Sequence, residues 1–504
     1  MNTVGTRLRP HALVGRRSVL KWLAAAVPAM QMSAHRGLAQ GQTNASPRID
    51  TRITRRGKAK RVLILGAGLS GLVAGYELMQ AGHAVTLLEG RTRPGGRVYT
   101  LRTPFSDGLI AEAGAGRIPI DHHWTHAYLR QFGLSTEPFE PATLAPLLVS
   151  KGRRIPLTPD TQLTQYFDDL SPEDKKLSPA EMAGKYLVPA LREVMSAGDV
   201  AAASWPPASL RKYDQYGFMD LFREHGASPG VAKILFSGAI PDVSALWGLR
   251  VLAATDFDHE ERIKGGNDLL PQAMAAKLSG KILYDARVIG VEDGRAGPRV
   301  TFIRAGEHHS VEGDYLICTL PFTTLRALEF MPTFSALKRQ AIREMAYASV
   351  VKVALQTPTR DWERQGLSGF AKTDRSSEIW SPAWNQASKR GILVLYQQGP
   401  TADEFDRLSP DALLLQGATT VQAVFPESKP DLANSTSYSW QLDEYARGAY
   451  GLVQPGQYYS WYPGAAAVEG RIHFAGEHLS ATPGFMQGAI TSGHRAAVEV
   501  NARA

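Results

Sequence analysis

The stretch RVLILGAGLSG, residues 61–71, decides the fold of this chain. Its first half is a continuous apolar run that ends at glycine, which is typical of a buried parallel strand. Its second half places Gly66, Gly68 and Gly71 at the start of a helical pattern, and a second apolar strand ends at Glu89. This order of strand, turn, helix and strand predicts a βαβ unit and an α/β fold.

Each of those four residues has a role in binding a dinucleotide. Gly66 permits the tight turn, and Gly68 lets the backbone approach a pyrophosphate. Gly71 lets helix and strand pack closely, and Glu89 can accept hydrogen bonds from ribose hydroxyls. The alternative is a plain glycine turn, which the acid at the end of the next strand disfavours.

The chain of 504 residues has a net charge of +8, and the positive excess lies at its start. Residues 1–61 contain thirteen Lys or Arg and one acid, Asp50, so the remaining residues have a net charge of about −4. We therefore expect no nucleic acid partner. The single cysteine, Cys318, excludes an intramolecular disulfide, and its apolar neighbours predict a buried structural thiol.

The basic start of the chain has the pattern of a leader. A twin-arginine pair at 16–17 precedes an apolar run, 22–30, and small residues at 37–39. This order predicts a signal peptide over 1–39 that the twin-arginine machinery exports, then a basic linker over 40–60. We expect a periplasmic or secreted protein without a stable membrane anchor, because the apolar run is too short to span a bilayer. The alternative is a disordered basic tail.

Two further motifs carry a resemblance to a known family. The run RPGGRV, residues 93–98, follows soon after Glu89, and FAGEHLSATPGFMQGAITSGHRAA, residues 474–497, closes the chain. Together they resemble the signatures of the flavin amine oxidase family. The resemblance implies a Rossmann-like FAD-binding domain of the GR2 type, a mixed-sheet substrate domain and a helical insertion. The implied segments are 61–104, 262–328 and 456–504 for the FAD-binding domain, 105–155 and 329–455 for the substrate-binding domain, and 156–261 for the helical domain.

The resemblance implies FAD as the cofactor and assigns residues to it. Arg97 would contact the flavin phosphates or ring, and the backbone of Val288, otherwise a plain strand residue, would hold the adenine. Glu477 would bond to the flavin side chain, and Met486 and Gln487 would lie over the ring. The implied cofactor-binding set is Gly66, Gly68, Gly71, Glu89, Gly96, Arg97, Val288, Glu477, Met486 and Gln487.

Two charged residues are candidates for the chemistry. Lys352, in YASVVKVALQ, resembles the family's lysine that holds a water against the flavin N5, although such a lysine is otherwise typical of a solvated strand face. Arg117, in GAGRIP, resembles the arginine with which the L-amino acid oxidase branch grips the substrate carboxylate. A planar guanidinium can make two charge-assisted bonds to a carboxylate and thereby orient the α-hydrogen. The alternative is an Arg117 paired to a nearby carboxylate such as Glu112.

The resemblance also places side chains around the substrate. In the family's amine oxidases two rings hold the amine. Here Phe485 supplies one ring, and Leu452 stands where the other is expected, unless Tyr458, Tyr459 or Trp461 refills the space. This difference favours an amino acid as the substrate.

A second contact to the carboxylate is less well matched. The family's amino acid oxidases often add a tyrosine hydroxyl from a segment that resembles EIWSP, residues 378–382, where the candidates are Trp380 and Ser381. Trp380 is also a candidate for the wall of the side-chain pocket. The implied substrate-binding set is Arg117, Trp380, Ser381, Gly484, Phe485 and Leu452.

The resulting prediction is an FAD-dependent L-amino acid oxidase that uses an L-amino acid and oxygen, with a homodimer as the common state in the family. Its rivals are an amine or polyamine oxidase on the same fold and a non-catalytic flavin-binding protein. We expect no metal, because His122, His123 and His126 have no acid or thiol ligands at suitable spacing.

Overall fold

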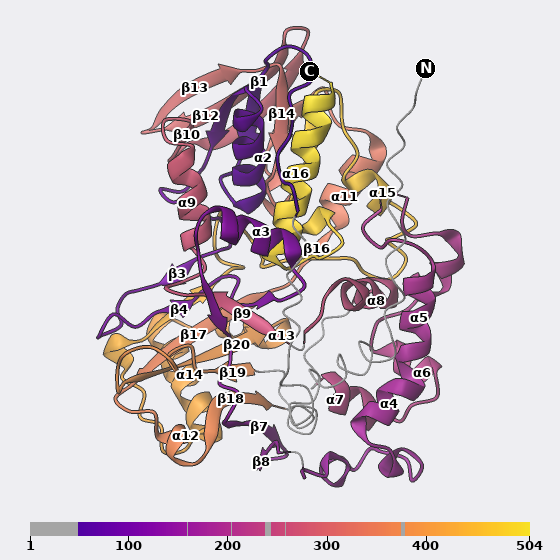
Figure 1. The fold of residues 1–504 in the computed structure, drawn as a ribbon, viewed down its shortest axis with the longest axis vertical. Helices are drawn as coiled ribbons and strands as arrows, with labels where there is room; N and C mark the ends of the chain where they lie inside the picture. The colour runs from indigo at the N-terminus through magenta and orange to yellow at the C-terminus, as the bar shows by residue number, and fades with distance from the viewer. Residues whose placement is uncertain are drawn as a thin grey trace.

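The structure is a computed structural model that describes residues 49–503, except 159, 203, 237–242, 258 and 374–377. The predicted signal peptide and residues 40–48 of the predicted linker lie outside the described residues. Figure 1 shows a sheet with covering helices at the top, a second large sheet at the lower left and a group of helices at the lower right. The fold is mixed α/β, as predicted.

A parallel five-stranded sheet forms the upper region. Its strand order is β10-β2-β1-β14-β23, so segments far apart in the sequence lie side by side. The strand β1 is buried from Val62 to Leu65, which confirms the prediction from its apolar run. The bounds are β1 Arg61–Leu65, β2 Ala84–Leu88, β10 Ile282–Leu283, β14 Tyr315–Cys318 and β23 Ile472–Phe474.

Two long helices pack together over this sheet. They are α2, Leu69–Gln80, and α16, Met486–Ala502, and their contact is close because Gly493 faces the backbone of Ser70. A Cβ at Gly493 would lie 2.2 Å from the Ser70 carbonyl oxygen. Other elements beside this region are α3 His123–Gln131, α9 Leu269–Lys277, α10 Phe322–Leu325, α11 Ala336–Glu344, α15 Tyr462–Ala465, and the sheet of β13 Glu307–Glu312, β12 Gly297–Arg304, β11 Arg287–Gly294 and β15 Glu329–Met331.

A seven-stranded sheet forms the second region, in the order β21-β17-β20-β19-β18-β7-β8. It is mixed, because β18 pairs with β7 in parallel and the other neighbours are antiparallel. Its register places Lys352, Tyr396, Glu378 and Lys372 in one row across four strands. The bounds are β7 Ala145–Ser150, β8 Arg153–Pro156, β17 Val350–Thr357, β18 Leu367–Thr373, β19 Glu378–Trp380, β20 Gly391–Gln398 and β21 Thr436–Ser439, with α12 Asp361–Arg364, α13 Pro400–Asp406 and α14 Pro410–Val424 nearby.

Short helices make up the third region. Within the predicted helical domain, the stretch 181–195 is two helices that meet at Leu187, because Pro189 lacks the N–H that a continuous helix would need. Their apolar faces share a core with residues of the segment 348–458. The helices are α4 Pro179–Tyr186, α5 Val188–Ser196, α6 Asp220–Glu224, α7 Pro229–Phe236 and α8 Ala245–Ala254.

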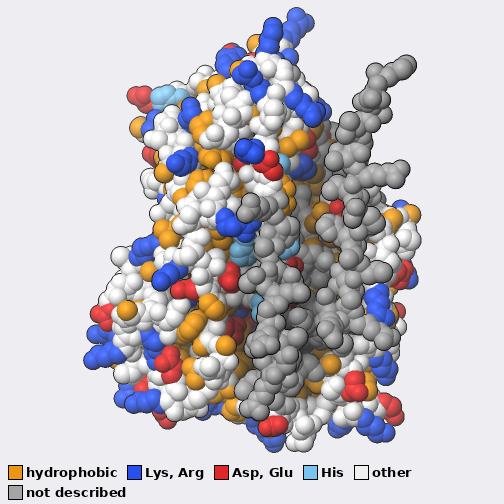
Figure 2. Space-filling model, in the orientation of Figure 1, with side chains coloured by type: hydrophobic (Ala, Val, Ile, Leu, Met, Phe, Trp, Pro, Cys, Tyr) orange, Lys and Arg blue, Asp and Glu red, His pale blue; other side chains and the backbone are white. Residues whose placement is uncertain are grey.

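Small ladders connect these regions. The pair β3 Thr100–Leu101 and β4 Ala111–Glu112 and the sheet β5 Ile118–Pro119, β9 Glu260–Ile263 and β6 Thr136–Pro138 carry several site residues. Figure 2 shows side chains of both charge signs on the visible face of the described chain. Within the described ranges, no helix is both long and apolar enough to cross a membrane. The predicted domain boundaries stay predictions.

Candidate active site

One cavity of about 520 Å³ joins the predicted cofactor residues to the predicted substrate residues. One end is lined by Gly66, Gly68 and Glu89, where the strands β1 and β2 of the upper sheet end. The other end is lined by Arg117 and Lys352, beside the seven-stranded sheet. The elements that line the cavity come from nearly the whole described length of the chain.

The glycine turn is shaped to hold a diphosphate. Gly68 precedes helix α2, whose first N–H groups have no side-chain cap and can bind an anion. A Cβ at Gly68 would meet no atom within 4 Å, so the space beside it is open to a ligand. Gly71 serves packing instead, because its Cβ would lie 2.0 Å from the carbonyl oxygen of Gly66. The carboxylate of Glu89 accepts the backbone N–H of Ala67 at 2.7 Å and so braces the turn from the next strand.

A second group of polar contacts lies around Glu477. Arg97 donates to the Glu477 carboxylate at 2.9 Å and also to the carbonyl oxygen of Ala449. The same carboxylate accepts the backbone N–H groups of Gly451 at 3.1 Å and Gly484 at 2.7 Å. These bonds fix the closing motif against the GGR motif, and residues of both line the cavity.

Most of the predicted cofactor residues line this cavity, and their individual roles stay predictions. Those that line it are Gly66, Gly68, Glu89, Gly96, Arg97, Val288, Glu477 and Met486. Gln487 does not, and its side-chain oxygen instead accepts the N–H and the hydroxyl of Thr125 at 3.0 and 3.2 Å. The reason is helical geometry, since consecutive residues of α16 point about 100° apart, so Met486 faces the cavity and Gln487 does not.

Lys352 is a buried residue and not the solvated lysine of an outer strand face. Its ammonium donates to the carbonyl oxygens of Gly114 at 2.6 Å and Glu112 at 3.2 Å, and it lies 5.2 and 5.4 Å from the ring centroids of Trp380 and Tyr396. Burial lowers the pKa of Lys352 to about 7. A lysine with such a pKa can exchange a proton near neutral pH.

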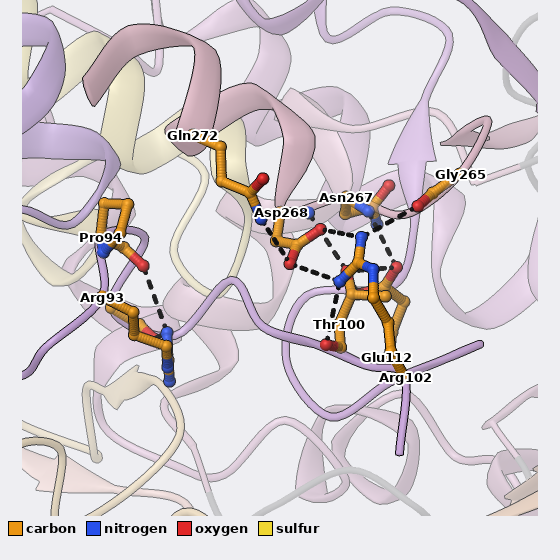
Figure 3. A network of polar contacts seen from close by, with 10 residues as sticks. Arg93, Pro94, Thr100, Arg102, Glu112, Gly265, Asn267, Asp268 and Gln272 are labelled. Atoms are coloured by element: carbon orange, nitrogen blue, oxygen red, sulfur yellow. Dashed lines mark hydrogen bonds and ion pairs between the residues drawn. The ribbon is translucent and has the colours of Figure 1, made fainter. Parts of the chain in front are cut away.

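Glu112, whose carbonyl is one of the two that hold Lys352, is itself fixed by a polar network (Figure 3). The Glu112 carboxylate accepts the Thr100 hydroxyl at 2.9 Å and the Asn267 N–H at 2.8 Å. Asp268, which pairs with both terminal nitrogens of Arg102 at 2.7 and 2.8 Å, donates its own N–H to Thr100. Burial raises the pKa of Glu112 to about 7. The network anchors strand β4 and, through it, the position of Lys352.

Arg117 lines the cavity with carboxylates already beside it. One terminal nitrogen donates to Glu378 at 2.9 Å, and its Nε lies 3.3 Å from Glu260. Its partner is therefore not Glu112, the carboxylate considered from the sequence. Burial disfavours a charged guanidinium, but the carboxylates of Glu378, Glu260 and Glu140 outweigh burial and raise the pKa of Arg117. Phe139 lies under the guanidinium, 4.8 Å from its central carbon.

Sequence reasoning missed the tyrosine that lines this end of the cavity. Tyr396 lies between Lys352 and Glu378 in the row across the sheet, and it lines the cavity together with Tyr450, whose hydroxyl donates to Gln398. The segment in which the sequence places the second hydroxyl is 378–382, where this chain has Trp380 and Ser381 in place of the family's tyrosine. A signal was present in strand β20, where Tyr396 directly follows the apolar run 391–395.

Two predicted substrate residues lie elsewhere. Strand alternation turns Glu378 and Trp380 toward the cavity and Ser381 away from it, beside Gly369. Leu452 packs in the core of the helical region, and Tyr450 lines the cavity together with Phe485. Tyr450 was not considered from the sequence, and the preference for an amino acid that rests on Leu452 stays a prediction.

The other aromatic candidates and His122 lie outside the cavity wall. Tyr458, Tyr459 and Trp461 are absent from the cavity wall, whereas Trp247 and Trp440 belong to it. His122 precedes helix α3 and packs its ring 5.0 Å from that of Phe485. Among the residues that the structure describes, no group of three His, Cys, Asp or Glu is arranged to hold a metal ion.

Comparison with known proteins agrees with this geometry. The model of the family described as flavin containing amine oxidoreductase matches residues 69–501. YobN of Bacillus subtilis (strain 168), whose name assigns it L-amino-acid oxidase activity only provisionally, is 33% identical and covers 88% of this chain and 95% of its own. The L-amino-acid oxidase of Demansia vestigiata is 31% identical and covers 88% of this chain and 87% of its own.

Solved structures share the fold. A putrescine oxidase redesigned in its cofactor binding superposes with a TM-score of 0.74 at 24% identity and covers 88% of this chain and 99% of its own. The cyclohexylamine oxidase of Brevibacterium oxydans IH-35A gives a TM-score of 0.71 at 18% identity with the same coverage. From the family match, the relatives and the dinucleotide cradle, the chain belongs to the flavin-containing amine oxidoreductase family, with FAD as its cofactor.

Proposed function

We propose that this oxidoreductase is an FAD-dependent L-amino acid oxidase, which deaminates L-amino acids to 2-oxo acids with release of ammonia and hydrogen peroxide. The observation that carries the proposal is an arginine, Arg117, at the substrate end of the cavity that also contains Lys352. Relatives named L-amino-acid oxidase at about 30% identity over most of the chain support it.

The side chains of the cavity have separate roles in this reaction. Arg117 binds the α-carboxylate and turns the α-hydrogen of the L-enantiomer toward the cofactor. Lys352 holds a water or the substrate amine, which must lose its proton before the carbon is oxidised. The walls of Trp380, Tyr396 and Phe485 exclude bulk water from the reacting carbon. When bound, the flavin supplies the acceptor for hydride.

An amine or polyamine oxidase is the second candidate, and two observations favour it. Arg117 already has a carboxylate partner in Glu378, and both Tyr450 and Phe485 line the cavity as a pair of rings could around an amine. A plain amine has no carboxylate, so it can bind while Arg117 stays paired with Glu378.

A substrate panel separates the candidates. Purified protein is supplied with L-amino acids, D-amino acids and amines, and hydrogen peroxide is measured. Peroxide from L-amino acids and not from their D-enantiomers supports the proposal, and peroxide only from amines overturns it. Anaerobic loss of the yellow flavin colour with any substrate would exclude a non-catalytic flavin-binding protein.

We also propose export by the twin-arginine route to the periplasm or the outside. The support is the order of basic pair, apolar run and small residues in the first forty positions. Replacing Arg16 and Arg17 by lysine should retain the protein in the cytoplasm, measured by cell fractionation. Unchanged export of the double variant would contradict this route.

A further inference from the structure

We propose, on the basis of the proposed function, that Glu378 determines specificity by occupying the fork of Arg117 where a substrate carboxylate has to bind. The two groups are joined by a bond of 2.9 Å, and both line the cavity. An L-amino acid therefore competes with a carboxylate of the protein itself. A plain amine leaves the pair intact.

The geometry distinguishes Glu378 from the other acids near Arg117. Glu260 lies beside Nε at 3.3 Å but does not line the cavity, and neither does Glu140. Among the acids that the structure describes, Glu378 alone both pairs with the guanidinium and lines the cavity. Its oxygen is bound to the terminal nitrogen of Arg117 to which the substrate carboxylate would also have to bind.

Neighbouring strands hold Glu378 in that position. The register places it between Tyr396 of β20 and Lys372 of β18, and the Lys372 ammonium lies 3.8 Å from its second oxygen. Its backbone on β19 is fixed by the ladder, so only the side chain can withdraw. Arg117 and Lys372 oppose the effect of burial and lower the pKa of Glu378, so the carboxylate is ionised at neutral pH.

The local charges give an incoming carboxylate little attraction. The positive charge of Arg117 lies beside the carboxylates of Glu378, Glu260 and Glu140, and Lys372 is already paired with Glu378. The guanidinium thus lies among carboxylates of the protein and not in a positive field. Removing the charge of Glu378 should weaken the repulsion of a substrate carboxylate, and one recovered charge-assisted bond corresponds to a change of about tenfold or more in KM.

The test compares the wild-type holoenzyme with Glu378→Gln and with Glu261→Gln. Glu261→Gln is the matched control. It removes a carboxylate from strand β9, which also carries Glu260, but this carboxylate lies beside His126 and not beside Arg117. The KM and kcat for L-phenylalanine and for phenethylamine are measured at pH 7.5. In Glu378→Gln the KM for L-phenylalanine should fall about tenfold, whereas the KM for phenethylamine should change less than about twofold. Glu261→Gln should match wild type.

A second measurement does not depend on turnover. Benzoate, a carboxylate without an amine, is titrated into the holoenzyme while the flavin absorbance is followed. The Kd for benzoate should fall in Glu378→Gln by a factor similar to that of the KM for L-phenylalanine. If Glu378→Gln fails to fold, Glu378→Asp takes its place and should lower the Kd as well, because its shorter side chain lies farther from the guanidinium.

The outcomes separate this inference from the proposed function. If wild type oxidises L-phenylalanine but Glu378→Gln shows an equal or higher KM and an unchanged Kd for benzoate, Glu378 is no competitor and the inference is overturned. A fall in KM for Glu261→Gln equal to that of Glu378→Gln overturns it too, because a general charge effect would then be sufficient. If wild type oxidises amines and no L-amino acid, the proposed function fails instead.

Discussion

At the scale of single residues, the side chain of Arg117 is defined by what surrounds it. Its guanidinium packs on Phe139 and Trp380 and faces Glu378 and Glu260, so its charge is partly shielded from water and lies beside carboxylates. A partly buried arginine tolerates this arrangement better than lysine, because its planar fork can satisfy several acceptors at once. Recognition of a carboxylate here depends on the shape of the fork as much as on its charge.

Arg117→Lys tests that dependence. The variant keeps the positive charge between the two carboxylates and loses the fork, so we expect the KM for an L-amino acid to rise about tenfold. The turnover of a plain amine should stay close to wild type. Steady-state peroxide assays measure both, and Arg299→Lys in an exposed ion pair of β12 and β13 serves as the control. A similar loss for the amine and the amino acid would contradict a role in carboxylate binding.

Lys352 makes a prediction about pH. Since burial lowers its pKa to about 7, the amine is charged below that pH and neutral above it. Only the neutral form can accept a hydrogen bond from water or from the substrate ammonium. We expect the rate of anaerobic flavin reduction to rise with pH through about 7 in wild type, and the Lys352→Met variant to be slower and to lack that step.

A second buried lysine provides the control. Lys338 is fully buried and also has a pKa lowered to about 7, but it donates to the Ala465 carbonyl and does not line the cavity. Lys338→Met should keep the pH step of wild type. A step that persists in Lys352→Met would assign it to another group, such as the substrate itself.

At the scale of elements, the turn between β1 and α2 combines two different uses of glycine. Gly68 faces open space in the cavity, whereas Gly71 faces the carbonyl oxygen of Gly66. Both belong to one motif, but Gly68 leaves room for a ligand and Gly71 lets the helix pack against the turn.

Paired alanine variants test the separation. For Gly71→Ala we expect the flavin-free protein to lose stability, by about 1–3 kcal/mol or more, because a Cβ has no room between helix and turn. Gly68→Ala should keep the melting temperature of the flavin-free protein but bind FAD more weakly, because its methyl group takes ligand space. Thermal unfolding and flavin titration measure the two effects. Equal stability of both flavin-free variants would refute the assignment.

The elements were more predictable from the sequence than the side chains of the site. The apolar run 61–65, the helix from Leu69 and the strand before Glu89 depend on local patterns, and each appears with its predicted type. The pairing of Arg117 with Glu378 joins residues 261 positions apart, which no local pattern encodes. Ser381 and Leu452 were misplaced because a motif fixes the position of a segment but not which face of it points inward.

At the scale of the whole molecule, the cavity unites segments that are remote in the chain. Its wall includes Gly66 near the start of the described chain and Ala489 in the last helix, with Lys352 from the seven-stranded sheet. A ligand that fills it contacts both the upper sheet and the lower one. Cofactor binding should therefore stabilise the assembly as a unit, because a ligand that binds only the native state adds its binding energy to stability.

The nucleotide end of the cavity allows a final prediction about this coupling. ADP carries the ribose and diphosphate that the glycine turn and Glu89 are positioned to bind, and it lacks the flavin. We expect ADP alone to raise the melting temperature of the flavin-free protein, by an amount equivalent to about 2.7 kcal/mol at a hundredfold excess over its Kd. Glu89→Gln should reduce this shift, because the neutral amide is a weaker acceptor for the ribose hydroxyls, whereas Glu292→Gln on the exposed face of β11 should not. If ADP leaves the melting temperature unchanged while FAD raises it, the stabilisation comes from the flavin end, and the dinucleotide turn does not couple the sheets.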